Sequence, residues 1–168
     1  EHGVHENIDS NIQLDEYTEL SKNKGVVVQQ KGNVIGALEK AERSVNATFH
    51  FPYLAHAPME PLNCTVKITG DKCEIWAGTQ APLLHQREVA TFLGLKPEQV
   101  FLNTPFLGGS FGRRGTFGLD WVMEAVHIAK ISGRFIKLIW TREDDIKGGF
   151  YRPVYVHRVK AAIGKDGF

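Results

Sequence analysis

A glycine-rich segment near the middle of the chain carries the residue types best suited to hold an anionic ligand. It reads Gly-Gly-Ser-Phe-Gly-Arg-Arg-Gly over residues 108–115. Glycine lets backbone N–H groups approach a ligand closely and adopts positive φ without strain. A helix that follows such a loop adds unpaired N–H groups and a dipole that favour an anion, and Arg113 and Arg114 would add charge-assisted hydrogen bonds. The segment therefore predicts an anion-binding loop.

Two other interpretations of this loop stay open at the level of the sequence. The segment lacks the Gly-Lys-Ser/Thr of a P-loop, and its glycine spacing does not fit a dinucleotide fingerprint. It could be a tight connection between a strand and a helix, with two solvated arginines. It could also be a generic phosphate-binding loop, in which case replacing Arg113 and Arg114 with alanine would abolish phosphate affinity.

Two helices are expected on either side of the loop. Pro82 suits the first position of a helix over residues 82–93, which has an apolar stripe and ends at Gly94. A longer helix is expected over residues 116–132, with apolar residues on one face and Gly133 as its end. These two helices must pack on strands to bury their apolar faces.

The clearest strand pattern is a β-hairpin. Residues 64–69 and 72–77 alternate between apolar and polar side chains, and the Gly-Asp pair between them suits a type II′ turn. In that register Cys64 and Cys73 share a face but lie roughly 13 Å apart along the ladder. A disulfide needs Cα atoms within about 7 Å. We expect two free, buried thiols; the alternative is a disulfide in a distorted hairpin.

The remaining elements are weaker signals, and residues 37–43 could be helix or loop. Three prolines within residues 52–61 exclude a regular element there. The other expected helices are a short one over 14–24 that ends at Gly25 and a short one capped by Thr141 and Asp144. Strands are expected over 26–28, 44–51, 99–103 and 154–163, with a buried strand over 135–140, and turns at Gly32-Asn33 and over 164–167. Mixed helices and strands with an antiparallel hairpin indicate an α+β fold, built on a mixed sheet and two main helices.

Length, charge and hydropathy exclude several classes of protein. The 168 residues are 42% hydrophobic and 23% charged, which suits one core better than two. The net charge of +1 gives no basic stripe for a nucleic acid. No apolar run approaches the length of a membrane span, and the start is not a signal peptide. Because the chain has no initiator Met, we expect it to come from a longer polypeptide, whose compartment, bacterial cytoplasm or periplasm, stays open.

The other titratable residues favour structural roles. None of the seven histidines has the spacing of a metal site, and His56 is expected to form a structural hydrogen bond. Adjacent Asp144 and Asp145 cannot face one another on a helix, so capping is preferred to an acid pair. The three tryptophans are expected in or near the core.

Several segments, in order, resemble one family. Residues 56–64 (His-Ala-Pro-Met-Glu-Pro-Leu-Asn-Cys), 76–82 (Trp-Ala-Gly-Thr-Gln-Ala-Pro) and the loop at 108–112 resemble the molybdopterin-binding region of molybdenum hydroxylases of the xanthine dehydrogenase and aldehyde oxidase kind. The Arg-Arg continuation of the loop and the segments at 141–145 and 151–153 are most similar to the isoquinoline 1-oxidoreductase branch, whose members are often named aldehyde dehydrogenase large subunits.

The resemblance implies a cofactor, a reaction and partners. The cofactor would be molybdenum on molybdopterin, with or without a cytosine dinucleotide extension. The reaction would be hydroxylation of an aldehyde or an N-heterocycle with oxygen from water. Electrons would leave through iron–sulfur clusters on a [2Fe–2S] partner subunit or domain, and the remaining domains of the same subunit would complete the site.

The resemblance also implies roles for individual residues. Gln80 would donate a hydrogen bond to an oxo ligand of the metal, and the backbone N–H groups of Phe111 and Gly112 would face the metal ligands and the pterin. No residue of this chain would bind the metal directly. The cofactor-binding set comprises Gln80, Gly108, Gly109, Ser110, Phe111, Gly112, Arg113 and Arg114.

Departures from the family pattern limit these expectations. Ser110 stands where the family has a third glycine, and Gly115 falls where xanthine-type enzymes carry a purine-binding Lys-Glu pair. A purine substrate is therefore in doubt. The catalytic Glu of the family belongs to a Gly-Glu-Pro segment further along than residue 168, so no catalytic residue is expected here and Glu60 does not take that role.

These observations predict an N-terminal extension or linker over residues 1–33 and a partial cofactor-binding domain, truncated at its C-terminus, over 34–168. Alone, the chain is expected to be inactive. The alternative from another class is a non-catalytic binding or assembly domain that keeps the fold without the cofactor.

Overall fold

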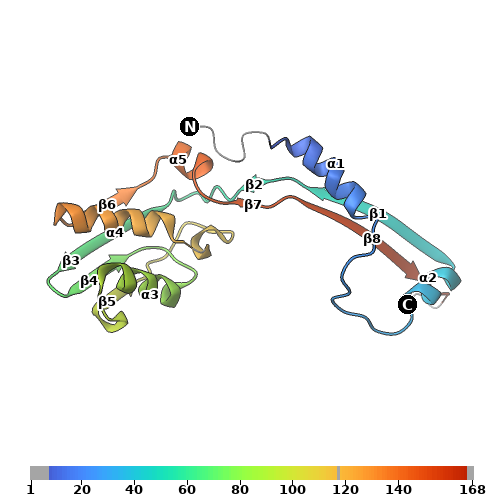
Figure 1. Cartoon of the computed structure of the whole chain (residues 1–168), viewed down its shortest axis with the longest axis horizontal. Helices are drawn as coiled ribbons and strands as arrows, with labels where there is room; N and C mark the ends of the chain where they lie inside the picture. Colours follow the sequence, from blue (N-terminus) through green and yellow to red (C-terminus); the bar gives the residue numbers. More distant parts are fainter. Residues whose placement is uncertain (1–7, 117, 166–168) are drawn as a thin grey trace. The chain divides into compact units, whose positions relative to one another are not determined.

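The structure is a computed structural model that describes residues 8–116 and 118–165 (Figure 1). The chain forms two compact units, one made of Glu1–Leu54 with Arg152–Phe168 and the other of Ala55–Tyr151. The chain passes between them within two short strands, β2 (Leu54–Ala55) and β7 (Tyr151–Arg152). The boundary that the sequence predicts at residue 33 stays a prediction.

The unit Ala55–Tyr151 is built on a four-stranded sheet in the order β5-β4-β3-β6. Its strands are β3 (Asn63–Thr69), β4 (Lys72–Trp76), β5 (Val100–Asn103) and β6 (Ile136–Ile139). β3 pairs antiparallel with both β4 and β6, whereas β4 pairs parallel with β5. The mixed sheet confirms the α+β expectation.

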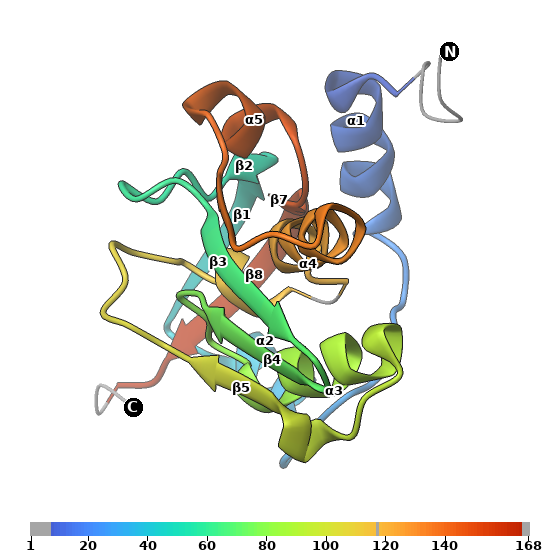
Figure 2. The same cartoon turned by 90° about the vertical axis from the view of Figure 1, so that its left-hand side faces the viewer.

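Two helices, α3 (Pro82–Leu93) and α4 (Asp120–Ser132), contact this sheet and one another (Figure 2). Both end at a glycine in the left-handed region, because φ is 73° at Gly94 and 63° at Gly133. The core lies between helices and sheet and contains Cys64, Val66, Cys73, Ile75, Val89, Ala90, Trp121, Val122, Ala125, Val126 and Ala129. Sequence periodicity predicted both helices, and α3 has the predicted bounds.

The hairpin forms in the predicted register. Thr69 lies opposite Lys72 and Ile68 opposite Cys73. φ is 59° at Gly70 and is not positive at Asp71, as a type II′ turn requires. Cys64 lies opposite Leu138 on the neighbouring strand, and both cysteines are free and buried, which confirms the prediction of free thiols.

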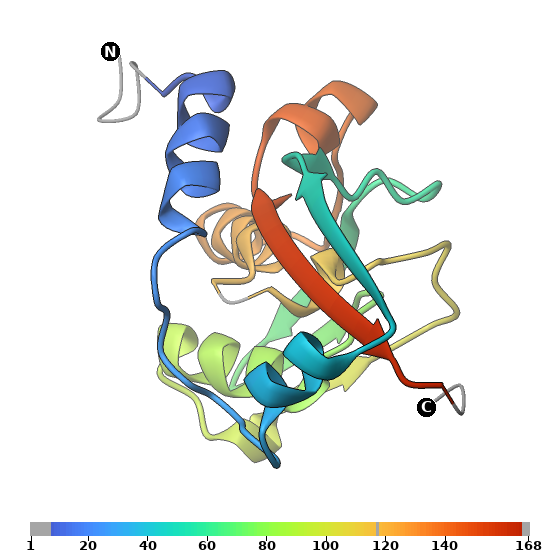
Figure 3. The ribbon, with the colours of Figure 1, turned by 90° about the vertical axis from the view of Figure 1, so that its right-hand side faces the viewer.

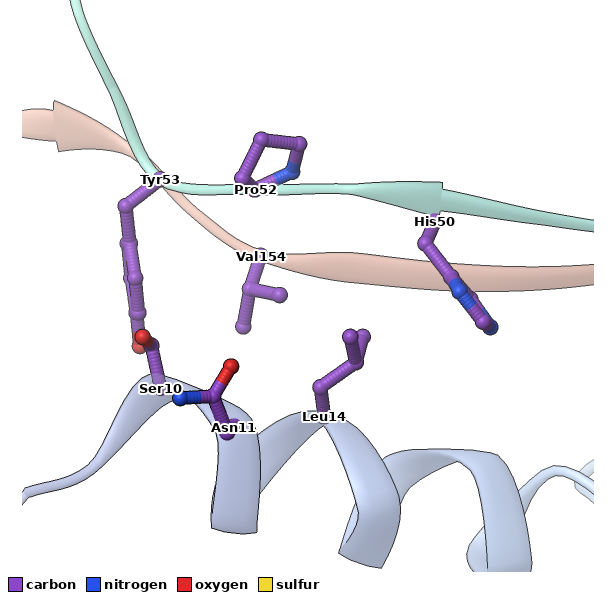
Figure 4. Close-up of a pocket in the computed structure, with 7 residues that line it drawn as sticks. All are labelled: Ser10, Asn11, Leu14, His50, Pro52, Tyr53 and Val154. Carbon is purple, nitrogen blue, oxygen red and sulfur yellow. The ribbon is translucent and has the colours of Figure 1, made fainter.

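The unit that contains both chain ends is a two-stranded antiparallel ribbon with two helices (Figure 3). β1 (Arg43–Phe51) pairs with β8 (Tyr155–Ile163) along its whole length. Helices α1 (Ser10–Leu20) and α2 (Val34–Lys40) contact β8. Between α1 and the ribbon lies a cavity of about 280 Å³, into which Tyr53 and Val154 extend from the ribbon side; it is lined by Ser10, Asn11, Leu14, His50, Pro52, Tyr53 and Val154 (Figure 4).

Several sequence expectations are wrong or incomplete. The first helix spans Ser10–Leu20 rather than residues 14–24 and does not reach Gly25, and the short strand β2 lies within the segment 52–61, where no regular element was expected. Residues 26–28 form no strand, and the exposed fractions of Val26 and Val28 are 93% and 94%, because no neighbouring strand pairs with them. α4 begins at Asp120, four residues later than expected, since a 3₁₀ turn over Arg113–Gly115 precedes it. β6 is a half-exposed edge strand rather than a buried one. The undecided segment 37–43 falls partly in α2.

The other elements agree more closely with the sequence. A 3₁₀ turn, Pro97–Gln99, leads into β5. Thr141 caps α5 (Arg142–Lys147), and Asp144 completes the capping box as predicted. The turn expected over 164–167 lies partly outside the described residues. Within the described residues, none of the helices combines the length and the apolar character that crossing a bilayer requires.

The buried cysteines generate a prediction about thiol reactivity. Burial raises the pKa of Cys64 to about 12 and that of Cys73 to about 11, so neither is a thiolate at neutral pH. We expect a disulfide-exchange reagent to react with less than one thiol per native chain within minutes and with two after denaturation. A Thr69→Cys variant, exposed at the hairpin turn, should add one fast-reacting thiol. If no thiol of the denatured chain reacts with the reagent, the assignment of free cysteines is contradicted.

Candidate cofactor-binding site

The glycine-rich loop adopts a backbone that exposes its centre. φ is 100° at Gly109 and 102° at Gly112, which is the region that glycine enters without strain. Phe111 between them also has positive φ, at 56°, and its side chain is 76% exposed. Phe111 is therefore not a core aromatic. A non-glycine residue held in this conformation marks a loop whose shape is fixed by its surroundings.

Four consecutive backbone N–H groups of the loop have no hydrogen-bond partner in the part of the chain that the structure describes. Among the hydrogen bonds of residues 8–116 and 118–165, none uses the N–H of Gly109, Ser110, Phe111 or Gly112 as its donor. The N–H groups on either side are engaged: that of Gly108 donates to Glu60, and those of Arg113 and Arg114 donate to Ser110. A run of unpaired donors in a loop with positive φ is the arrangement that binds anions and oxygen ligands.

Gln80 lies against this loop. Its backbone N–H donates to Arg114 O at 3.1 Å, and its side-chain Oε1 accepts a hydrogen bond of 2.6 Å from Ser110 Oγ. A β-carbon added at Gly115 would stand 3.4 Å from Gln80 Cβ, which shows how closely the two segments pack. The fold thus brings together Gln80 and the loop residues, which are separate in the sequence and were predicted to form one set.

Arg114 connects the loop to residues 58–62. Its side chain is fully buried, and it donates from Nε to Gly109 O and from Nη2 to Glu60 O, both at 2.9 Å. Nη2 also lies 3.2 Å from Glu60 Oε2. Burial lowers the pKa of Arg114, and the carboxylates of Glu60 and Asp145 partly offset that effect. The guanidinium is therefore not solvated but holds the loop against residues 58–62. We call the contacts of Arg114 and Glu60 with each other and with the loop backbone the brace.

Glu60 completes the brace from the other side. Its Oε2 accepts a hydrogen bond of 2.6 Å from Gly108 N, and its own N–H donates to Gly108 O at 3.2 Å. Partial burial would raise the pKa of Glu60, but hydrogen bonds from Gly108 and Asn63 and the charge of Arg114 outweigh it and lower the pKa. A β-carbon at Gly108 would lie 2.6 Å from Glu60 Cβ, so only glycine fits there.

Arg113 is also internal. Its side chain is 2% exposed and forms a two-pronged ion pair with Asp120, with contacts of 3.1 Å and 2.6 Å. The guanidinium lies over the rings of Trp121, Trp140 and Phe150 at 5.6–5.7 Å. The interpretation of the two arginines as solvated is therefore wrong, because both are buried and paired, Arg113 with Asp120 seven residues along and Arg114 with the distant Glu60.

A third ion pair, not foreseen from the sequence, holds residues 58–59. Arg142 Nη2 donates to Pro58 O at 2.7 Å and to Met59 O at 3.0 Å, while Nη1 pairs with the buried Asp145 at 2.6 Å. The motif at 141–145 carried the family resemblance, but neither spacing nor charge revealed its partner. The only available signal was that a helical Arg and Asp three residues apart can pair.

Two histidines flank the site. His56 Nδ1 is buried without a partner among the described residues, and His56 Nε2 would lie 3.8 Å from a β-carbon on Gly112. The structural hydrogen bond expected for His56 is thus absent from the described residues. His85 is buried on α3, with Nε2 3.4 Å from Thr79 Oγ1 and its ring edge-on to Trp121.

The residues at the loop fit an oxygen-rich anionic cofactor and do not fit a bare metal ion. The described residues contain no group of three or more His, Cys, Asp or Glu side chains placed to hold a metal. The loop instead offers unpaired N–H donors and glycines that allow close approach. Such donors suit phosphate or metal-oxo oxygens on a cofactor that brings its own metal ligands.

His85 generates a prediction about pH and stability. Burial lowers the pKa of His85 to about 4, whereas an unfolded histidine titrates near 6.5. Between these values the unfolded state binds the extra proton, so the unfolding free energy falls as the pH is lowered from about 6.5 to 4, by on the order of 3 kcal/mol. Urea unfolding at several pH values should show this slope in the native protein and its reduction in His85→Gln. The exposed-histidine variant His127→Gln should keep the native slope, and an equal slope in His85→Gln would contradict the assignment.

Arg114 generates a prediction about the brace. Arg114→Met removes the charged partner of the partly exposed Glu60 and the hydrogen bonds to two carbonyls, and should lower the unfolding free energy by about 2 kcal/mol in urea titrations. The exposed variant Arg87→Met on α3 should change it by less than about 0.5 kcal/mol. A Glu60→Met/Arg114→Met double variant should recover part of the loss because no unpaired charge remains. Equal midpoints for Arg114→Met and Arg87→Met would exclude the brace.

Comparison with known proteins identifies the family of this chain. Residues 17–168 match the family model of the molybdopterin cofactor-binding domain. The chain is 34% identical to isoquinoline 1-oxidoreductase subunit beta of Brevundimonas diminuta, over 92% of this chain and 21% of that protein. It is 31% identical to the membrane-bound aldehyde dehydrogenase (pyrroloquinoline-quinone) of Gluconacetobacter polyoxogenes, over 86% of this chain and 19% of that protein.

A solved structure agrees as well. Aldehyde oxidoreductase from Desulfovibrio gigas aligns with a TM-score of 0.66 and 26% identity, over 80% of this chain and 15% of that chain. The chain spans about a fifth of the length of the two curated relatives. The resemblance found in the motifs is confirmed: the chain belongs to the molybdopterin cofactor-binding domain family.

Proposed function

We propose that this chain supplies part of the cofactor pocket of a molybdenum-dependent oxidoreductase that hydroxylates an aldehyde or an N-heterocycle. The observation that carries the proposal is the run of four unpaired N–H groups at Gly109–Gly112 beside the Gln80 side chain. When bound, the cofactor supplies a redox-active metal centre for transfer of oxygen from water to carbon. A relative named isoquinoline 1-oxidoreductase and one named aldehyde dehydrogenase support the substrate class.

The residues of the predicted site divide into two roles in this proposal. The N–H groups of Phe111 and Gly112 and the amide of Gln80 donate to oxygen acceptors of the cofactor. Gly108, Gly109 and Ser110 give the loop its close approach and its shape. Arg113 and Arg114 act through the loop, since both guanidinium groups are buried and paired with carboxylates. This arrangement gives no support to a phosphate site made by the two arginines themselves.

The rest of the active site lies outside this chain in our proposal. Other domains of the same subunit enclose the cofactor and contribute the catalytic carboxylate, and a [2Fe–2S] subunit or domain accepts the electrons. The cofactor carries the cytosine dinucleotide extension, whose additional phosphate supplies further acceptor oxygens. We also propose that residues 1–33 are an extension to the cofactor-binding part, 34–168.

A Gln80→Ala variant tests the proposal in the enzyme purified with its other domains and subunits from a molybdenum-replete host. Loss of one preorganised donor in such a site typically lowers kcat about 100-fold. We expect this loss for oxidation of benzaldehyde or isoquinoline, with the molybdenum content reduced as well. The matched control is Gln86→Ala on α3, whose amide binds the carbonyls of Pro97 and Val100 and which should retain kcat within about twofold, as for a residue that contacts no reacting group.

Metal and organic phosphate analysis of the same preparations separates the alternatives. About one molybdenum per chain supports the cofactor, and phosphate beyond the pterin's own group supports the dinucleotide form. An intact enzyme that contains neither molybdenum nor pterin would favour a non-catalytic binding domain. An enzyme that contains a quinone in place of molybdenum would also overturn the proposal.

A further inference from the structure

We infer that Ser110 is a positioning residue that fixes the amide of Gln80 with its NH₂ group turned away from Ser110 and available to the cofactor. This inference rests on the proposed function, because it concerns what Gln80 presents to the ligand. It starts from the short hydrogen bond between Ser110 Oγ and Gln80 Oε1. Ser110 is also the loop residue that departs from the glycine pattern that the sequence resembles.

The direction of that hydrogen bond follows from the other partner of Ser110. Arg114 N–H lies 3.0 Å from Ser110 Oγ, and a backbone N–H can only donate. The serine oxygen therefore accepts from Arg114, and its hydroxyl proton remains to be placed. The 2.6 Å separation from Gln80 Oε1 is in the usual range of O–H···O bonds and shorter than N–H···O bonds. The hydroxyl accordingly donates to the amide oxygen.

The opposite orientation of the Gln80 amide is disfavoured. It would turn NH₂ toward Ser110 Oγ, which already accepts from Arg114. The serine proton would then have no acceptor in the hydrogen-bond network of the described residues, although Ser110 is buried. A buried donor without a partner is unfavourable. Ser110 thus selects one of two amide orientations that are otherwise nearly equal in shape.

The selected orientation makes the site a set of donors only. Gln80 Nε2 takes part in none of the hydrogen bonds formed by residues 8–116 and 118–165, so its two N–H groups stay free. They join the four unpaired N–H groups of the loop. A rotated amide would present its oxygen instead, which repels an acceptor such as an oxo or phosphate oxygen. Ser110 therefore tunes the site toward oxygen-rich ligands.

The backbone explains why a serine is tolerated at this position. The loop residues with positive φ are Gly109, Phe111 and Gly112, whereas φ of Ser110 is not positive. A side chain at 110 therefore adds no backbone strain. The position can carry a hydroxyl while its neighbours keep the conformation that exposes the N–H groups.

A double-variant cycle tests whether Ser110 acts through Gln80. We would compare Ser110→Ala, Gln80→Ala and the double variant in the cofactor-loaded enzyme with benzaldehyde as substrate. Ser110→Ala should lower kcat about tenfold, as expected for about 1.4 kcal/mol from one hydrogen bond, and should change KM less than twofold. The double variant should match Gln80→Ala, because the hydroxyl has no effect once the amide is gone. The molybdenum(V) EPR signal of Ser110→Ala should shift toward that of Gln80→Ala, and molybdenum loss on dialysis should accelerate in both.

Three further variants control for structure. Thr116→Ala removes a hydroxyl that binds Arg113 in the same loop without touching Gln80; it should leave kcat within twofold in either Gln80 background. Ser110→Thr keeps the hydroxyl and should rescue the EPR signal. If Ser110→Ala shows no cooperative thermal unfolding transition, and so does not fold, Ser110→Gly takes its place.

The outcomes separate this inference from the proposed function. If Gln80→Ala retains native kcat, EPR signal and molybdenum content, the proposed function fails. Two outcomes with an impaired Gln80→Ala would overturn only the role of Ser110. Either the Ser110 substitution has no effect, or its full effect adds to that of Gln80→Ala in the double variant. A tenfold loss that disappears in the Gln80→Ala background supports the inference.

Discussion

The shape of the candidate site depends on one ion pair, that between the buried Arg114 and the partly exposed Glu60. Arg114 has no exposed surface, and its guanidinium is held by the Glu60 carboxylate, the Glu60 carbonyl and the Gly109 carbonyl. A charge in that position is tolerated only when it is paired and hydrogen-bonded. The pair therefore links two segments 54 positions apart in the chain and fixes how the glycine-rich loop lies on residues 58–62.

This constraint separates the residues that shape the site from those that face a ligand. The charged side chains point inward: Arg114 to Glu60, Arg113 to Asp120, and Arg142 to Asp145. What the loop offers outward is backbone N–H, together with the exposed ring of Phe111. A site made of backbone donors is preorganised, because its groups cannot rotate away as long side chains do. It also tolerates sequence change better than a site made of charged side chains, provided that the internal ion pairs persist.

The sequence predicted best those features that depend on neighbours in the chain. The hairpin register followed from alternation around Gly70-Asp71, the end of α3 from Gly94, and the cap of α5 from Thr141 with Asp144. It failed where a distant partner decides. Val26–Val28 has strand composition but no strand to pair with. Arg114 looks like a surface charge until Glu60, 54 positions away, is placed beside it. The pairing of Arg113 with Asp120 is nearer in the chain, but it depends on the turn between the loop and α4. The site residues were grouped by family resemblance, whereas their division of labour required the three-dimensional contacts.

Phe111 shows why the ion pairs and the proposed binding role belong together. A phenylalanine at φ of 56° with an exposed ring is strained and buries little apolar surface. Four unpaired N–H groups beside it contribute no internal hydrogen bonds. Folding alone would not favour such a loop, so its conformation is imposed by the surrounding brace, which holds the strain in place. Strain that is maintained by ion pairs and accompanied by free donors fits the binding role that we propose for this loop. The stability that the brace contributes and the binding proposed for the loop would then be two consequences of the same contacts.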